Sequence, residues 1–136
     1  MKATKLFIII VIAAGLILTA CTSTNTLTDT QWRLSTYGDQ LALPKPDVTL
    51  NFTEDRISGS DGCNSYGGSY TTDGSNFKVG SDMVSTMMAC DEQIMAQSSA
   101  FYAALNQAAT FKIDGQKLVL MNSDGNGLAV FYATGK

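Results

Sequence analysis

The sequence contains no histidine among its 136 residues. A Ser-His-Asp triad, a Cys-His pair, a histidine general base and zinc sites with histidine ligands are therefore excluded. Paired acids occur at Glu54-Asp55 and Asp91-Glu92, but the first pair falls in an expected turn and the second at an expected helix start. We therefore predict that the protein is not an enzyme, with no catalytic residues and no cofactor.

Basic side chains are also scarce. The chain has nine Lys and Arg residues against twelve Asp and Glu residues, and the basic residues form no run. Binding of nucleic acid begins with neutralisation of phosphates by clustered basic side chains, so nucleic acid is excluded as a partner. The same scarcity excludes electrostatic attachment to anionic lipid headgroups.

The first twenty residues have the order of a bacterial lipoprotein signal peptide. Lys2 and Lys5 precede an apolar run over residues 6–18, which is shorter than the roughly 20 residues of a membrane-spanning helix. Leu18-Thr-Ala-Cys21 resembles the lipobox, in which the cysteine is acylated and becomes the new N-terminus. We expect a signal peptide over residues 1–20, lipidation at Cys21 and a membrane anchor formed by the acyl chains. The alternative is an ordinary signal peptide with a chance cysteine.

The remaining chain, residues 21–136, has the length of one domain. Loss of Lys2 and Lys5 leaves seven basic residues against twelve acidic ones, a formal charge of −5. Residues 21–30 are polar and contain one leucine, which predicts a flexible tether before a domain over residues 31–134. Thr22 follows Cys21 in place of the Asp that tends to retain enteric lipoproteins at the inner membrane. This resemblance implies the outer membrane, facing the periplasm.

Alternating apolar residues indicate β-structure through most of the domain. The clearest alternation is Val48, Leu50 and Phe52. It continues in three later pairs or triplets: Phe111 and Ile113, Leu118 and Leu120, and Leu128, Val130 and Tyr132. One helix is expected from a cap at Asp91 to about Asn106. The sequence predicts a mainly β fold with one inserted helix: a small curled antiparallel sheet or partly open barrel, with the helix covering one end.

The stretch 58–70 contains four glycines and is interpreted as one bent strand with bulges. Asn64, Tyr66 and Tyr70 alternate along it and are the candidates for a binding surface, because tyrosine offers a broad apolar face with a polar tip. The alternative is that the two tyrosines pack in the core with satisfied hydroxyls.

Several of these motifs together resemble the META domain, or HslJ-like, family. They are Trp32-x-Leu34, Val48-x-Leu50-x-Phe52, Ile57-Ser-Gly-x-x-Gly-Cys-Asn64, Gly68-x-Tyr70, Ser85-Thr-Met-Met-Ala-Cys90, Phe101-x-x-x-Leu105, Leu118-x-Leu120 and Leu128-x-Val-Phe131. The resemblance covers nearly all of residues 29–132 and implies a protein of the cell envelope. It implies no particular biochemical activity.

Cys63 and Cys90 are the only cysteines after Cys21. A disulfide between them suits an exported domain. The alternatives are a redox-active pair, for which no Cys-x-x-Cys spacing or neighbouring basic residue is present, and free thiols. Free Cys90 with Met83, Met87 and Met88 would suit a soft metal such as Cu(I), whereas methionines also fill irregular gaps in a core.

We predict a lipid-anchored, non-enzymatic envelope protein that supports stress tolerance by contacting another envelope component. A second prediction is inhibition of a lysozyme-like hydrolase, since small β-barrel lipoproteins include such inhibitors and an acidic domain can approach a basic hydrolase. Copper binding is the third.

Overall fold

The computed structural model describes residues 25–135, which form ten strands and one helix. The strands are β1 (Gln31–Tyr37), β2 (Gln40–Leu41), β3 (Thr49–Phe52), β4 (Arg56–Ser60), β5 (Ser65–Asp73), β6 (Asn76–Val79), β7 (Val84–Ser85), β8 (Thr110–Asp114), β9 (Lys117–Met121) and β10 (Gly127–Gly135); the helix is α1 (Glu92–Gln107).

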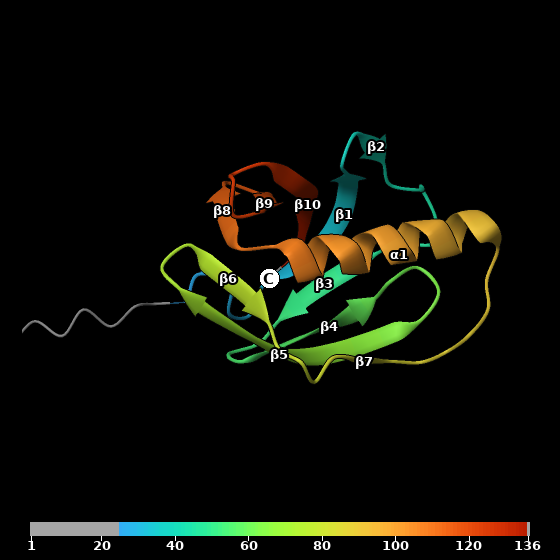
Figure 1. Ribbon diagram of the computed structural model, residues 1–136, viewed down its shortest axis with the longest axis horizontal. Helices are drawn as coiled ribbons and strands as arrows, with labels where there is room; N and C mark the ends of the chain where they lie inside the picture. Colours follow the sequence, from blue (N-terminus) through green and yellow to red (C-terminus); the bar gives the residue numbers. More distant parts are fainter. Residues whose placement is uncertain (1–24, 136) are drawn as a thin grey trace, which may run out of the picture.

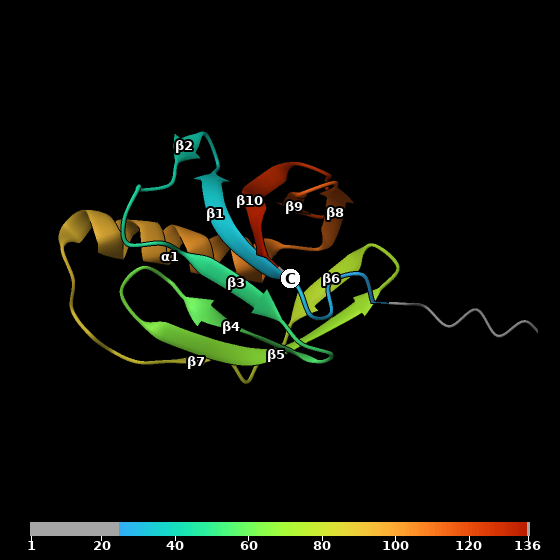
Figure 2. The same cartoon turned by 180° about the vertical axis from the view of Figure 1, so that it is seen from behind.

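Eight of the strands close into an antiparallel barrel. Hydrogen bonding follows the order β10-β9-β8-β6-β5-β4-β3-β1, and β1 then pairs with β10, where Leu34 lies opposite Phe131. The short strands β2 and β7 lie outside this ring and pair with β1 and β5. Figures 1 and 2 show the barrel from opposite sides. The predicted mainly β fold with one helix is confirmed, and the pairing of β1 with β10 closes the barrel.

Helix α1 packs against β1, β6, β9 and β10, near one end of the barrel. Its buried face carries Phe101 and Leu105, which are 0% and 1% exposed. The ring of Phe101 lies 5.4 Å from that of Tyr66 and 6.3 Å from that of Phe131, so the helix joins both sides of the barrel in one core. Asp91 occupies the N-cap position as predicted, but its side chain forms no capping hydrogen bond.

The stretch 58–70 is a hairpin, so its prediction as a single bent strand is wrong. β4 and β5 pair antiparallel and are joined by a turn over residues 61–64. Asp61 Oδ1 accepts hydrogen bonds from the backbone N–H groups of Cys63, at 2.7 Å, and Asn64. Gly62 has a φ of +94°, which favours glycine. The buried carboxylate therefore defines a turn that glycine content alone does not reveal.

The predicted tether over residues 21–30 is wrong for the described part, residues 25–30. Leu27 is 0% exposed and belongs to the core. The Asn25 side-chain amide donates a hydrogen bond to the Tyr70 hydroxyl at 2.7 Å, and Asp29 N–H donates to the carbonyl of Phe52 at 3.1 Å. One leucine is thus enough to order this polar segment, because the barrel provides a site for it.

The predicted signal peptide over residues 1–20 and the predicted lipidation site, Cys21, lie outside the described residues. Within residues 25–135, α1 is neither long enough nor apolar enough to cross a bilayer.

Candidate functional site

Residues 81–91, here called the strap, connect β6 to α1 along the outside of the barrel. The strap pairs with β5 through β7, where Tyr66 lies opposite Ser85 and Gly67 opposite Val84. It then runs in extended form beside α1 and enters the helix at the end remote from β8 (Figure 1). The sequence does not predict this element, because its two-residue strand gives no alternating pattern.

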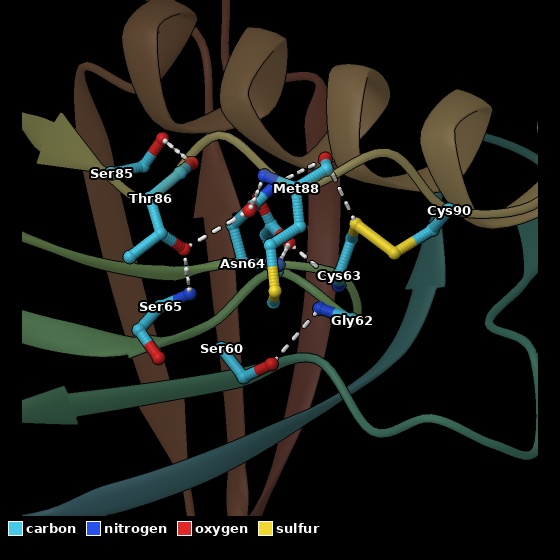
Figure 3. Close-up of a disulfide and its surroundings, with 10 residues drawn as sticks. Ser60, Gly62, Cys63, Asn64, Ser65, Ser85, Thr86, Met88 and Cys90 are labelled. Carbon is cyan, nitrogen blue, oxygen red and sulfur yellow. Dashed lines mark hydrogen bonds between the residues drawn. A yellow bond between two sulfur atoms is a disulfide. The ribbon is translucent and has the colours of Figure 1, made fainter.

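A disulfide joins the end of the strap to the hairpin turn. The sulfur atoms of Cys63 and Cys90 lie 2.04 Å apart, and their Cα atoms are separated by 6.0 Å (Figure 3). Cys63 lies in the turn between β4 and β5, and Cys90 lies just before α1. The bond therefore fastens strap, helix start and barrel to one another.

Asn64 attaches the strap to the barrel beside the disulfide. Its Oδ1 accepts hydrogen bonds from Met88 N–H at 2.6 Å and from the Thr86 hydroxyl at 3.0 Å, as Figure 3 shows. Thr86 N–H in turn donates to the carbonyl of Ser65 at 3.0 Å. Asn64 is only 7% exposed, so its amide supports the strap from within and offers no surface for a ligand.

Tyr66 and Tyr70 are interior residues, with exposures of 5% and 4%. Their hydroxyls donate to the carbonyls of Thr49 and Thr53, each at 2.7 Å. Burial raises the pKa of both phenols, that of Tyr66 strongly. The predicted binding surface of Asn64, Tyr66 and Tyr70 is therefore wrong, and the alternative of core packing holds for the two tyrosines.

A buried polar cluster connects the hairpin turn with α1. Asp61 and Gln97 are 1% and 0% exposed, and Gln97 Oε1 accepts a hydrogen bond from Leu43 N–H at 2.7 Å. Burial alone would raise the pKa of Asp61. Hydrogen bonds from the N–H groups of Asn64 and Cys63, together with the hydroxyls of Ser98 and Tyr102, outweigh this effect and lower the pKa. Burial and the neighbouring Asp61 raise the pKa of Tyr102 to about 12. This enclosed cluster supports the turn and presents no nucleophile to solvent.

The strap and the first turn of α1 expose a group of apolar side chains, here called the methionine patch: Val84, Met87, Met88 and Met95. Their exposures are 68%, 96%, 57% and 38%. Among residues 25–135 only two other large apolar side chains are comparably exposed, and these are Leu41 and Tyr132. A pocket of about 230 Å³ adjoins the patch and is lined by Met83, Val84, Ser85, Tyr102, Leu105 and Asn106.

The Cu(I) alternative assigned to Met83, Met87, Met88 and Cys90 lacks its thiolate in this structure, because the sulfur of Cys90 is bonded to Cys63. Met83 is half-buried and packs on the core, whereas Met87 and Met88 point to solvent. Within the described part of the chain, no group of three or more Cys, Asp or Glu side chains is arranged to hold a metal.

Comparisons with known proteins identify a family. The model of the META domain matches residues 25–135. A protein from Burkholderia xenovorans solved by NMR is 26% identical, with a TM-score of 0.66 over 81% of this chain and 85% of its own. A DUF4847 family protein from Bacteroides vulgatus has the same fold at 16% identity, with a TM-score of 0.56 over 79% of this chain and 94% of its own. Among curated proteins, no sequence matches this chain.

Proposed function

Because this chain belongs to the META domain family, we propose that it is a lipid-anchored protein of the cell envelope that binds another envelope component through the methionine patch. The role we assign to this contact is tolerance of envelope stress. The protein acts by binding, and no chemical step is assigned to it.

The observation that carries this proposal is the exposure of Met87 and Met88 on a segment that is held in place. Full burial of a methionine side chain is worth about 1.5–3 kcal/mol, so exposure of two adjacent methionines forgoes a large stabilisation. The disulfide and Asn64 fix the backbone that presents them. Large apolar side chains exposed together on one ordered segment are typical of an interaction surface.

Two further features support the envelope as the compartment. A disulfide between Cys63 and Cys90 persists in oxidising compartments, and the cytoplasm keeps such thiols reduced. The lipobox-like Leu18-Thr-Ala-Cys21 supplies an anchor that does not depend on basic residues. The outer membrane, with the domain facing the periplasm, is the location that Thr22 favours.

Site-specific photo-crosslinking in living cells tests the binding surface. A photoreactive phenylalanine analogue replaces Met87 in one strain and Leu41 in a control strain, because Leu41 is 79% exposed on β2, away from the strap. We expect a discrete crosslinked envelope protein from position 87 and none from position 41. Equal crosslinking from both positions, or none from position 87, contradicts the proposal.

Deletion of the gene tests the physiological part of the proposal separately. The deletion strain is expected to lose tolerance to heat, detergents or envelope-active drugs, and the wild-type gene should restore it. A Met87→Ser, Met88→Ser gene should restore it less well. Unchanged tolerance after deletion would remove the stress role while leaving the binding surface to the crosslinking test.

A further inference from the structure

We infer that the partner presents a basic amphipathic helix to the methionine patch. This inference rests on the proposed function and specifies the chemistry of the partner segment. It follows from the charges around the patch, from the chemistry of methionine and from the shape of the surface between the strap and α1.

The charged side chains carried by the strap and α1 themselves are all acidic. No basic residue occurs between Lys78 and Lys112, a stretch that contains the whole strap and the whole of α1. Asp91 and Glu92 are exposed and lie between Met88 and Met95 along the chain. Within residues 25–135 neither forms an ion pair, whereas Asp82, at the other end of the strap, is paired with Arg56 at 3.4 Å. A partner that covers the methionines is therefore favoured when it carries basic groups at its edge.

Methionine suits a helical partner. Its unbranched, polarisable side chain adapts to the shape of an apolar helix face, and methionine-rich surfaces are used in this way to bind amphipathic helices. Met87 and Met88 lie on a strap that runs beside α1, as Figure 3 shows for the part from Ser85 to Cys90. The pocket beside Val84 offers room for one apolar side chain of the incoming segment.

Geometry favours a partner over the chain's own N-terminal segment as the occupant. Asn25, where the described chain begins, is bonded to Tyr70 and to the carbonyl of Glu54. The chain therefore enters the barrel beside the turn from β3 to β4, whereas Met88 is bonded to Asn64 in the turn from β4 to β5, at the opposite end of β4. Only residues 21–24 would remain before Asn25 in a chain processed at Cys21.

A peptide-binding measurement tests the inference. The full chain is placed in nanodiscs of zwitterionic lipid on a biosensor, and empty nanodiscs supply the reference. The probe is an 18-residue helical peptide with leucine on one face and lysine on the other; matched peptides carry glutamate in place of lysine, or serine in place of leucine. We expect binding of the Leu/Lys peptide alone, weakening as the salt concentration rises.

Variants locate the contact. Met87→Ser with Met88→Ser should weaken binding about tenfold, because residues at the centre of an interface contribute most to affinity. Asp91→Asn with Glu92→Gln should weaken it about threefold and reduce its dependence on salt. Leu41→Ser and Asp124→Asn, exposed residues on β2 and in the loop before β10, should leave it unchanged. Unchanged circular dichroism and melting temperature would show that the variants remain folded.

Three outcomes would overturn the inference. The first is equal binding of the Leu/Glu peptide, and the second is loss of peptide binding in the control variants. The third is that full-chain nanodiscs bind protein-free anionic vesicles and that this binding is abolished by Met87→Ser with Met88→Ser. The last result would assign the patch to a lipid surface. Crosslinking from position 87 to a partner segment that is acidic or neutral would also reject it, while the proposed function would stand.

Discussion

Asp61 is a buried carboxylate whose role is to hold the hairpin turn. It accepts hydrogen bonds from two backbone N–H groups of that turn and lies against hydroxyls of α1. The sequence marks this position only as an acid among glycines, which is typical of an exposed turn. The burial and hydrogen bonding of Asp61 depend on where α1 packs, so the sequence alone does not distinguish it from an exposed turn residue.

Replacement of Asp61 by Ala should lower the free energy of unfolding at pH 7 by about 2–6 kcal/mol, because two buried N–H groups lose their acceptor at roughly 1–3 kcal/mol each. Urea denaturation followed by circular dichroism provides the measurement. Asp124→Asn, in an exposed loop, serves as the control and should change stability by less than about 0.5 kcal/mol. A change of similar size in both variants would contradict the structural role of Asp61.

The stability supplied by the Asp61 charge should depend on pH. Since folding lowers the pKa of this carboxyl, its contribution is fully present above the unfolded value of about 3.9 and is lost as the pH falls through the folded value. Asp61→Asn keeps an acceptor oxygen and removes this contribution. The difference in unfolding free energy between wild type and Asp61→Asn should therefore shrink below about pH 4, and a constant difference would contradict the assignment.

Gly68 and Gly67 provide a matched pair for testing how closely the strap approaches β5. A Cβ at Gly68 would lie 2.4 Å from Met83 Sδ and 3.1 Å from Met83 Cα, whereas a Cβ at Gly67 would come no closer than 3.5 Å to Ile57 O. Gly68→Ala should therefore lower the melting temperature and loosen the strap, at a cost of about 1–3 kcal/mol. Gly67→Ala should change stability much less, and equal losses in the two variants would contradict the close approach of Met83 to Gly68 as the cause.

At the scale of elements, the strap depends on one covalent bond and a few hydrogen bonds. Cys63 and Cys90 are 27 positions apart, and closure of a loop of this length in the unfolded chain is worth about 3–4 kcal/mol. The sequence predicted this pairing as one of three alternatives. It did not predict that the bond fixes a strap, because β7 is two residues long and its exposed side chains follow no period.

Replacement of both Cys63 and Cys90 by Ser should lower the free energy of unfolding by about 3 kcal/mol and free the strap locally. Hydrogen exchange provides the local measurement, because Thr86 N–H and Met88 N–H are bonded to Ser65 and Asn64 in the intact protein. Their protection should fall more than that of barrel amides such as Leu34 N–H. Uniform loss of protection would show that the bond supports the barrel as a whole.

The segment before β1 shows how tertiary structure overrides composition. Residues 25–30 are polar apart from Leu27, which predicts a tether, but the barrel core accepts that leucine. Leu27→Ala should therefore cost about 2–5 kcal/mol in unfolding free energy, as for other buried leucines. Leu41→Ala is the control, since Leu41 is 79% exposed, and a similarly small effect at both positions would restore the tether interpretation.

At the scale of the whole molecule, the alternation of apolar residues was enough to predict the fold class. Trp32, Leu50 and Leu118 occupy the positions that alternation assigns to the core. In the last strand the alternation of Leu128, Val130 and Tyr132 indicated the wrong face, because Ala129 and Phe131 are buried there and Tyr132 is 49% exposed. Closure of the barrel could not be predicted, because the pairing of β1 with β10 joins segments that are remote in sequence. The exposed methionine patch was missed for a different reason: methionines are typical core residues, and only the structure places these on the surface.

The compartment and the covalent state of the protein decide whether this surface meets an envelope partner at all. Intact mass spectrometry of the native protein from isolated membranes measures both together. The account predicts a chain that begins at Cys21, carries acyl groups on that residue and lacks two hydrogen atoms because Cys63 and Cys90 are joined. An unmodified Cys21 together with free thiols at Cys63 and Cys90 would contradict it.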